Sequence, residues 1–165
     1  MSGGVPTVSP TPAGAPAYRL ILLAAVLSLG HHLDHLVRGT HVGWPLTEEV
    51  TPFTYSLVVY PLLLLGLALS RSGRVGPGSW LLLSGGGAVF LAAVHLAPGA
   101  LEPPGDVVSG YASAPLGWLA LAELLALLGV LLAHATYAGH AWRRGRQRPS
   151  PAATALALRA RPGLR

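Results

Sequence analysis

Residues 17–38 read AYRLILLAAVLSLGHHLDHLVR, an almost wholly apolar run that ends in a cluster of polar side chains. The run matches the ~20 predominantly apolar residues that an α-helix needs to cross a bilayer. Residues 1–16, which precede it, are rich in Pro, Gly, Ser and Thr and lack the basic start of a cleavable signal peptide. We therefore expect a membrane-spanning helix at about residues 17–37, preceded by a disordered tail of residues 1–16.

Three further apolar runs, near residues 53–70, 79–97 and 115–139, have a similar length. The chain of 165 residues is 52% hydrophobic and only 10% charged, whereas an ordinary soluble domain is roughly a quarter charged. The predicted fold class is therefore all-α. We expect a polytopic integral membrane four-helix bundle at residues 17–142, with a disordered tail at each end.

Two local features modify these runs. Pro61 lies inside the second run, where a proline removes a backbone hydrogen bond and kinks a helix. Gly85, Gly86 and Gly87 follow one another in the third run, and small residues let a neighbouring membrane helix approach closely. We expect a kinked second helix and a tight helix contact at the three glycines.

The charges in the connections predict the orientation of the bundle. Arg71 and Arg74 lie between the second and third runs, and seven of the eleven Arg follow Trp142. The first and third connections each hold two acids, Glu102 among them, and no Arg. Because cytoplasmic loops carry an excess of basic residues, we expect a multi-pass cell-membrane protein with both termini in the cytoplasm and a basic cytoplasmic tail at residues 143–165.

The same distribution of charge predicts the partners. The formal net charge is +5, but the Arg cluster lies directly behind the last apolar run. Positive charge at that place sets topology and attracts anionic lipid. We therefore expect the lipid bilayer as the partner, with anionic lipid at the C-terminal Arg cluster, and no nucleic acid. A homo-oligomer or a larger membrane complex stays open.

The composition also excludes some classes of function. The chain contains no Cys, which removes disulfide frameworks, thiolate metal sites and Cys-ligated iron–sulfur clusters. It shows no internal repeat of the kind from which inverted-repeat transporters are built. Four short helices in one copy also offer little room for alternating access.

The polar residues of the first run form one stripe. His31, Asp34, His35 and Arg38 lie at positions i, i+3, i+4 and i+7 of the expected helix and therefore share a face. Ionisable groups inside a membrane span are costly and by default mark a functional site. The stripe is therefore the candidate site.

Other runs place polar groups at the same depth. At a rise of about 1.5 Å per residue, His95 in the third run lies roughly 10 Å above the midplane, and Glu123 in the fourth roughly 6 Å above it. Tyr55 in the second run reaches a similar level. We therefore expect these groups to meet the stripe in the outer leaflet.

These residue types favour a metal ion. Two His at i, i+4 can present both imidazoles to one ion, and facing helices of a bundle can complete the ligand set. Nitrogen and oxygen donors suit Zn, Fe, Mn or oxidised Cu. The predicted ligands are His31, His35, His95 and Glu123. The predicted supporting residues around them are Asp34, Arg38 and Tyr55.

Three other functions stay open on the sequence alone. Haem bound between His95 and His31 or His35 would give an electron-transfer protein. The same His and carboxyl groups could act as proton donors and acceptors on a lipophilic substrate without a cofactor. A non-enzymatic accessory subunit of a larger membrane complex would use the polar cluster to fasten its helices together. The substrate and the reaction type are not specified by any of these patterns.

Overall fold

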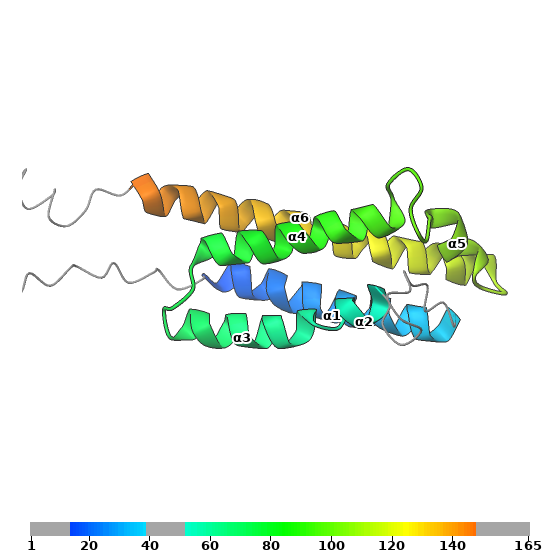
Figure 1. Cartoon of the computed structure of the whole chain (residues 1–165), viewed down its shortest axis with the longest axis horizontal. Helices are drawn as coiled ribbons and strands as arrows, with labels where there is room; N and C mark the ends of the chain where they lie inside the picture. The colour runs from blue at the N-terminus through cyan, green and yellow to red at the C-terminus, as the bar shows by residue number, and fades with distance from the viewer. Residues whose placement is uncertain (1–13, 39–51, 148–165) are drawn as a thin grey trace, which may run out of the picture.

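The computed structural model describes residues 14–38 and 52–147 (Figure 1). This part of the chain folds into helices and contains no strand, which confirms the all-α class. The helices are α1 (Ala15–Arg38), α2 (Pro52–Ser56), α3 (Val59–Arg71), α4 (Pro77–His95), α5 (Pro104–Ser109) and α6 (Ala114–Gln147). The predicted tail residues 1–13 and 148–165 lie outside the described residues, as does most of the first connection, residues 39–51.

Four helical segments are long and apolar enough to cross a membrane, by length and composition, and they coincide with the four predicted runs. They are Ala15–Arg38, Thr54–Arg71, Pro77–His95 and Ala114–Gln147. The last segment is longer than predicted and includes the first residues of the predicted basic tail. The reason is that no proline interrupts the sequence after Gly139 before Pro149.

The second segment is broken between α2 and α3, at Leu57 and Val58. Pro61 lies four residues after Leu57, so it has no N–H to donate to the Leu57 carbonyl, and its ring crowds that carbonyl. The Tyr60 N–H donates to the Leu57 carbonyl in the i to i−3 pattern of a turn, and the i to i−4 pattern of an α-helix follows where the Leu62 N–H donates to the Val58 carbonyl. The predicted kink is confirmed and takes the form of a break one turn before the proline.

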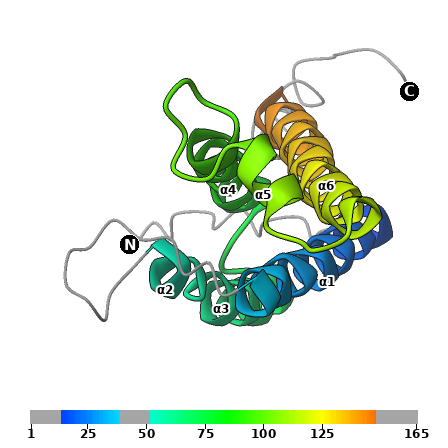
Figure 2. The ribbon, with the colours of Figure 1, turned by 90° about the vertical axis from the view of Figure 1, so that its right-hand side faces the viewer.

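Helix α6 is the centre of the bundle. It packs along α4 and α1 and carries the short α5 near its N-terminal end, whereas α3 makes only sparse backbone contacts with the other helices (Figure 2). Two clusters of buried apolar side chains join these helices, one around the first half of α6 and one near the start of α4. The first contains Leu91, Val107, Leu121, Leu124 and Leu127, and the second contains Ile21, Trp80 and Ala138.

The close helix contact differs from the predicted one. A Cβ added at Gly85 or Gly86 would meet no described atom within 4 Å, and one at Gly87 would make only ordinary van der Waals contacts. The prediction of a tight contact at these three glycines is therefore wrong. The tight approach lies at Gly117 of α6, where a Cβ would be 2.2 Å from the carbonyl oxygen of Val108 in α5.

Candidate metal centre

Three imidazoles meet where the C-terminal ends of α1 and α4 lie together. His31 and His35 come from successive turns of α1, and His95 is the last residue of α4. One ring nitrogen of each can be chosen so that all three lie within 4.8 Å of one another. The Nε2 atoms of His31 and His35 are 3.3 Å apart. All three side chains are buried, so the structure brings together three of the four predicted ligands.

The ring of His95 is fixed by the chain that follows it. Its Nδ1 lies 3.0 Å from the backbone carbonyl oxygen of Glu102, and the N–H form of this nitrogen donates to that carbonyl. The tautomer that makes this bond leaves Nε2 with a lone pair. Metal-binding histidines commonly donate their second nitrogen to a carbonyl in this way, which orients the ring.

A carboxylate that the sequence did not single out lies beside the imidazoles. Glu102 is 1% exposed, and its Oε2 is 3.6 Å from His35 Nε2 and 3.5 Å from His95 Nδ1. Its backbone N–H donates to Val94 near the end of α4. The sequence assigned Glu102 only to an acidic outer connection. Its position seven residues after His95 was the one signal that could have placed it near the end of that helix.

Glu102 is held by a chain of polar contacts. Its Oε1 accepts a hydrogen bond from Arg38, whose Nε also donates to Asp34 Oδ2 at 2.9 Å. The Tyr111 hydroxyl donates to the other oxygen of Asp34. Burial raises the pKa of Tyr111 to about 12, and the hydrogen bond to Asp34 acts in the same direction. The predicted supporting residues Asp34 and Arg38 therefore contact Glu102 and Tyr111 on the side of α1 next to the imidazoles.

The formal charges of Asp34, Arg38 and Glu102 favour a cation beside them. Two carboxylates, Asp34 and Glu102, share one guanidinium, that of Arg38, so that the three groups sum to one negative charge. Charge that is removed from water is costly unless it is balanced by an opposite charge. A metal ion next to Glu102 Oε2 would therefore meet an acidic group rather than a second cation.

Glu123, the predicted fourth ligand, lies elsewhere. It faces Gly30 of α1, where an added Cβ would be 3.1 Å from Glu123 Oε1, and it lines a second, smaller cavity with Asp34 and Tyr111. Neither of its carboxylate oxygens has a hydrogen-bond partner among the described residues. Glu123 therefore lies at the level of Gly30 and Asp34 of α1, but the rise per residue specifies only position along a helix. It did not give the direction of the side chain, which points to a different face of α1.

Tyr55 and His32 lie near the three imidazoles, and side-chain hydrogen bonds hold His32 in place. Tyr55 lines the main cavity with half of its surface exposed. His32 ties α1 to the broken second segment, with its Nε2 2.7 Å from Ser56 Oγ and its Nδ1 3.0 Å from the Tyr60 hydroxyl. Its Nδ1 also lies 2.6 Å from the carbonyl oxygen of Ser28. His32 therefore acts as a structural contact beside the three imidazoles.

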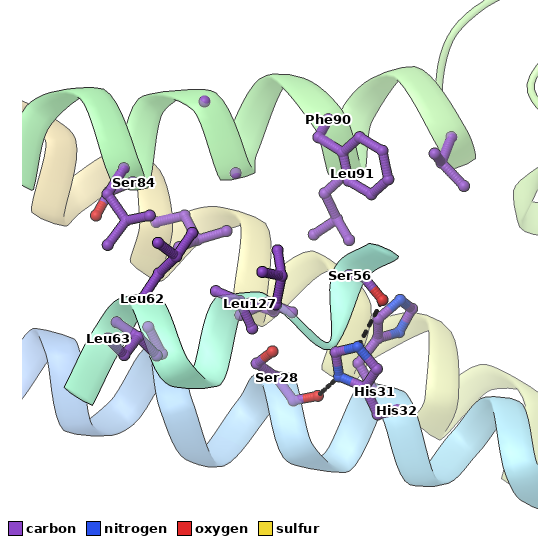
Figure 3. A pocket seen from close by; sticks show the side chains of 18 of the residues that line it. Ser28, His31, His32, Ser56, Leu62, Leu63, Ser84, Phe90, Leu91 and Leu127 are labelled. Carbon is purple, nitrogen blue, oxygen red and sulfur yellow. Dashed lines mark hydrogen bonds between the residues drawn. The ribbon is translucent and has the colours of Figure 1, made fainter. Parts of the chain in front are cut away.

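The imidazoles open onto a cavity of about 330 Å³ between α1, α3, α4 and α6. Figure 3 shows this cavity with His31 and His32 at one end and Ser84 of α4 towards the other. Most of the side chains between the two ends are aliphatic, so the cavity is an apolar space with polar groups near its ends. A molecule that occupies it could reach the histidine group.

Comparison of the chain with protein-family models, curated proteins and solved structures gives no match. The functional assignment therefore depends on the geometry and chemistry of the site itself.

Proposed function

We propose that the chain is an integral membrane protein that binds one divalent transition-metal ion through His31, His35 and His95. Glu102 replaces Glu123 as the carboxylate next to the three imidazoles. The ion serves binding or redox chemistry at the head of the apolar cavity. The observation that carries the proposal is the convergence of three buried imidazoles from two helices, with candidate ligand atoms within 4.8 Å of one another.

The distances suit an ion. Zn–N bonds of about 2.0–2.1 Å in a tetrahedral site place two ligand nitrogens about 3.3 Å apart. The Nε2 atoms of His31 and His35 already have that separation, at 3.3 Å. His95 is oriented by the Glu102 carbonyl, which leaves its Nε2 as the nitrogen that could bind the same ion. Nitrogen and oxygen donors without thiolate suit Zn, Fe, Mn or oxidised Cu.

The chemistry follows from an open ligand position. Three imidazoles leave one position of a tetrahedral ion for a water molecule or substrate, as in catalytic rather than structural metal sites. That position can face the cavity, because all three imidazoles line it. Glu102, held by Arg38 through its other oxygen, is placed either to bind the ion or to accept a proton from a group on it.

The membrane setting is part of the same proposal. The connection with Arg71 and Arg74 lies at the same end of the bundle as the Arg-rich end of α6 and the start of α1 (Figure 1). The histidine group and α5 lie towards the opposite end. With the basic end in the cytoplasm, both termini are cytoplasmic and the metal centre lies in the outer leaflet.

A single ion is better supported than haem. A haem plane has to pass between its two axial ligands. Here the ring centroids of His31 and His35 are 4.7 Å apart, those of His31 and His95 are 5.1 Å apart, and the rings meet edge to face. The three imidazoles therefore fill the space that the macrocycle would need.

Metal content tests the proposal. The protein is purified in mild detergent, supplied with Zn, Fe, Mn or Cu, freed of excess metal and examined by elemental analysis. We expect about one ion per chain, and at least a tenfold loss of affinity when His35 or His95 is replaced by Ala, because each variant removes a ligand. His140→Ala is the matched control, because His140 is exposed on α6.

Two outcomes would overturn the proposal. One is a protein that retains none of the four metals under these conditions. The other is a haem absorption band that disappears in the His95→Ala variant, which would assign the histidines to haem instead.

A further inference from the structure

The main cavity also reaches a second polar pair, far from the histidine group. His134 of α6 is 2% exposed and lines the cavity together with Ser84 of α4. The Nδ1 of His134 lies 2.7 Å from Ser84 Oγ. The Nε2 of the same ring is buried and has no hydrogen-bond partner among the described residues. Buried polar atoms are rarely left in this state in native proteins, so this nitrogen calls for a partner from outside the described chain.

The neighbouring Trp80 side chain does not hydrogen-bond to His134. The Trp80 ring lies 5.8 Å from it, but the Trp80 N–H donates to Ser70 Oγ at 2.8 Å. The hydrogen bond to Ser84 allows either tautomer of His134, because a hydroxyl can either donate or accept. If Ser84 accepts from Nδ1–H, then Nε2 is an acceptor, and if Ser84 donates to Nδ1, then Nε2–H is a donor. The pair can therefore match either a hydroxyl or a carbonyl oxygen.

The rest of the cavity defines the body of the ligand. Ser84 and His95 are eleven residues apart on α4, which corresponds to about 16 Å along the helix. Among the described residues no Arg lines the cavity, and the one carboxylate that does, Glu102, belongs to the histidine end. An ionised head group would thus meet no opposite charge at His134. The wall between the two ends includes the aliphatic side chains Leu62, Leu63, Leu83, Leu91, Leu127 and Leu131.

We propose that this cavity binds an uncharged lipophilic molecule whose terminal hydroxyl or carbonyl oxygen bonds to His134 Nε2 and whose hydrocarbon part extends towards the histidine group. The site does not require a bound metal ion. The orphaned nitrogen fixes the position of the oxygen, and the length of the apolar wall sets the length of the chain at about 16 Å.

Binding of dodecanol, dodecane and dodecanoate to the full chain in lipid nanodiscs tests this proposal, with empty discs measured to subtract partition into lipid. We expect dodecanol to bind about fivefold to tenfold more tightly than dodecane, because only the alcohol can bond to His134. Dodecanoate should bind more weakly than dodecanol at neutral pH, because its charge has no counter-ion there. In His134→Leu the preference for the alcohol should disappear, while His140→Leu, which changes an exposed residue of the same helix, should keep it.

Two further measurements show whether the alcohol contacts His134 directly and whether the variant keeps its metal centre. In the wild-type chain, dodecanol should shift the imidazole nitrogen signals that His134→Leu removes from the NMR spectrum, and dodecane should not. The metal content of His134→Leu should equal that of the wild type, so that failure of this site is distinguishable from failure of the metal centre. Equal binding of alcohol and alkane, or an alcohol preference that survives in His134→Leu, would overturn the proposal.

Discussion

At the scale of single residues, the sequence placed some groups of the site and missed others for a physical reason. The i, i+4 spacing of His31 and His35 and the depth of His95 were enough to predict that the three imidazoles meet. Depth along a helix does not specify rotation about it, so Glu123 was assigned to the wrong neighbours. Glu102 lies in a connection, where no periodicity positions a side chain, and only its short distance in sequence from His95 pointed to it.

Substitutions test whether Glu102, rather than Glu123, is the carboxylate that supports metal binding. Glu102→Gln keeps the size of the side chain and removes its charge next to His35 and His95. We expect the dissociation constant for the metal ion, measured by competition with a chelator, to rise about tenfold to a hundredfold. Glu123→Gln is the matched control and should leave the constant unchanged, because Glu123 lines the second cavity. Weaker binding in the Glu123 variant alone would restore the ligand set that was read from the sequence.

At the scale of elements, the four long helices were predictable because length and apolar composition decide membrane spans. The break before Pro61 was also predictable, since the missing N–H and the ring act on a known position. The short α5 and its tight contact with α6 were not predictable. Sequence alone does not distinguish Gly117 from Gly85, Gly86 and Gly87 of α4, which make no close contact, because the difference lies in which helix passes nearby.

This contact yields a prediction about stability. Gly117→Ala would place a methyl group 2.2 Å from the Val108 carbonyl oxygen, so α5 has to move. We expect the variant to be destabilised by about 1–3 kcal/mol and to show a lower Tm in detergent. Gly129→Ala is the control on the same helix, because its Cβ would meet no described atom within 4 Å. That variant should be as stable as the wild type or more stable, by up to about 1 kcal/mol. Equal Tm values for both variants would contradict the close packing of α5 on α6.

At the scale of the whole molecule, the cavity could not have been predicted. Leucines cover both the outer surface and the interior, as the exposed Leu82 and the buried Leu124 illustrate, so apolar composition does not reveal which face of a helix points inward. The structure adds that α3 meets the other helices through side chains such as Leu63, Leu67 and Ser70, with few close backbone approaches, and that an apolar space with polar groups near its ends lies between α1, α3, α4 and α6. We propose that one end of that space binds a metal ion and that the other end holds the oxygen of a lipophilic ligand.

X-ray absorption at the metal edge of the loaded protein shows whether one ion is bound by imidazoles from both α1 and α4. We predict about three imidazole nitrogens at roughly 2.0–2.1 Å for zinc, and the loss of one of them in His95→Ala. A metal shell made of oxygen ligands alone, or a spectrum that is the same in His95→Ala and in the wild type, would rule out a metal centre shared by α1 and α4.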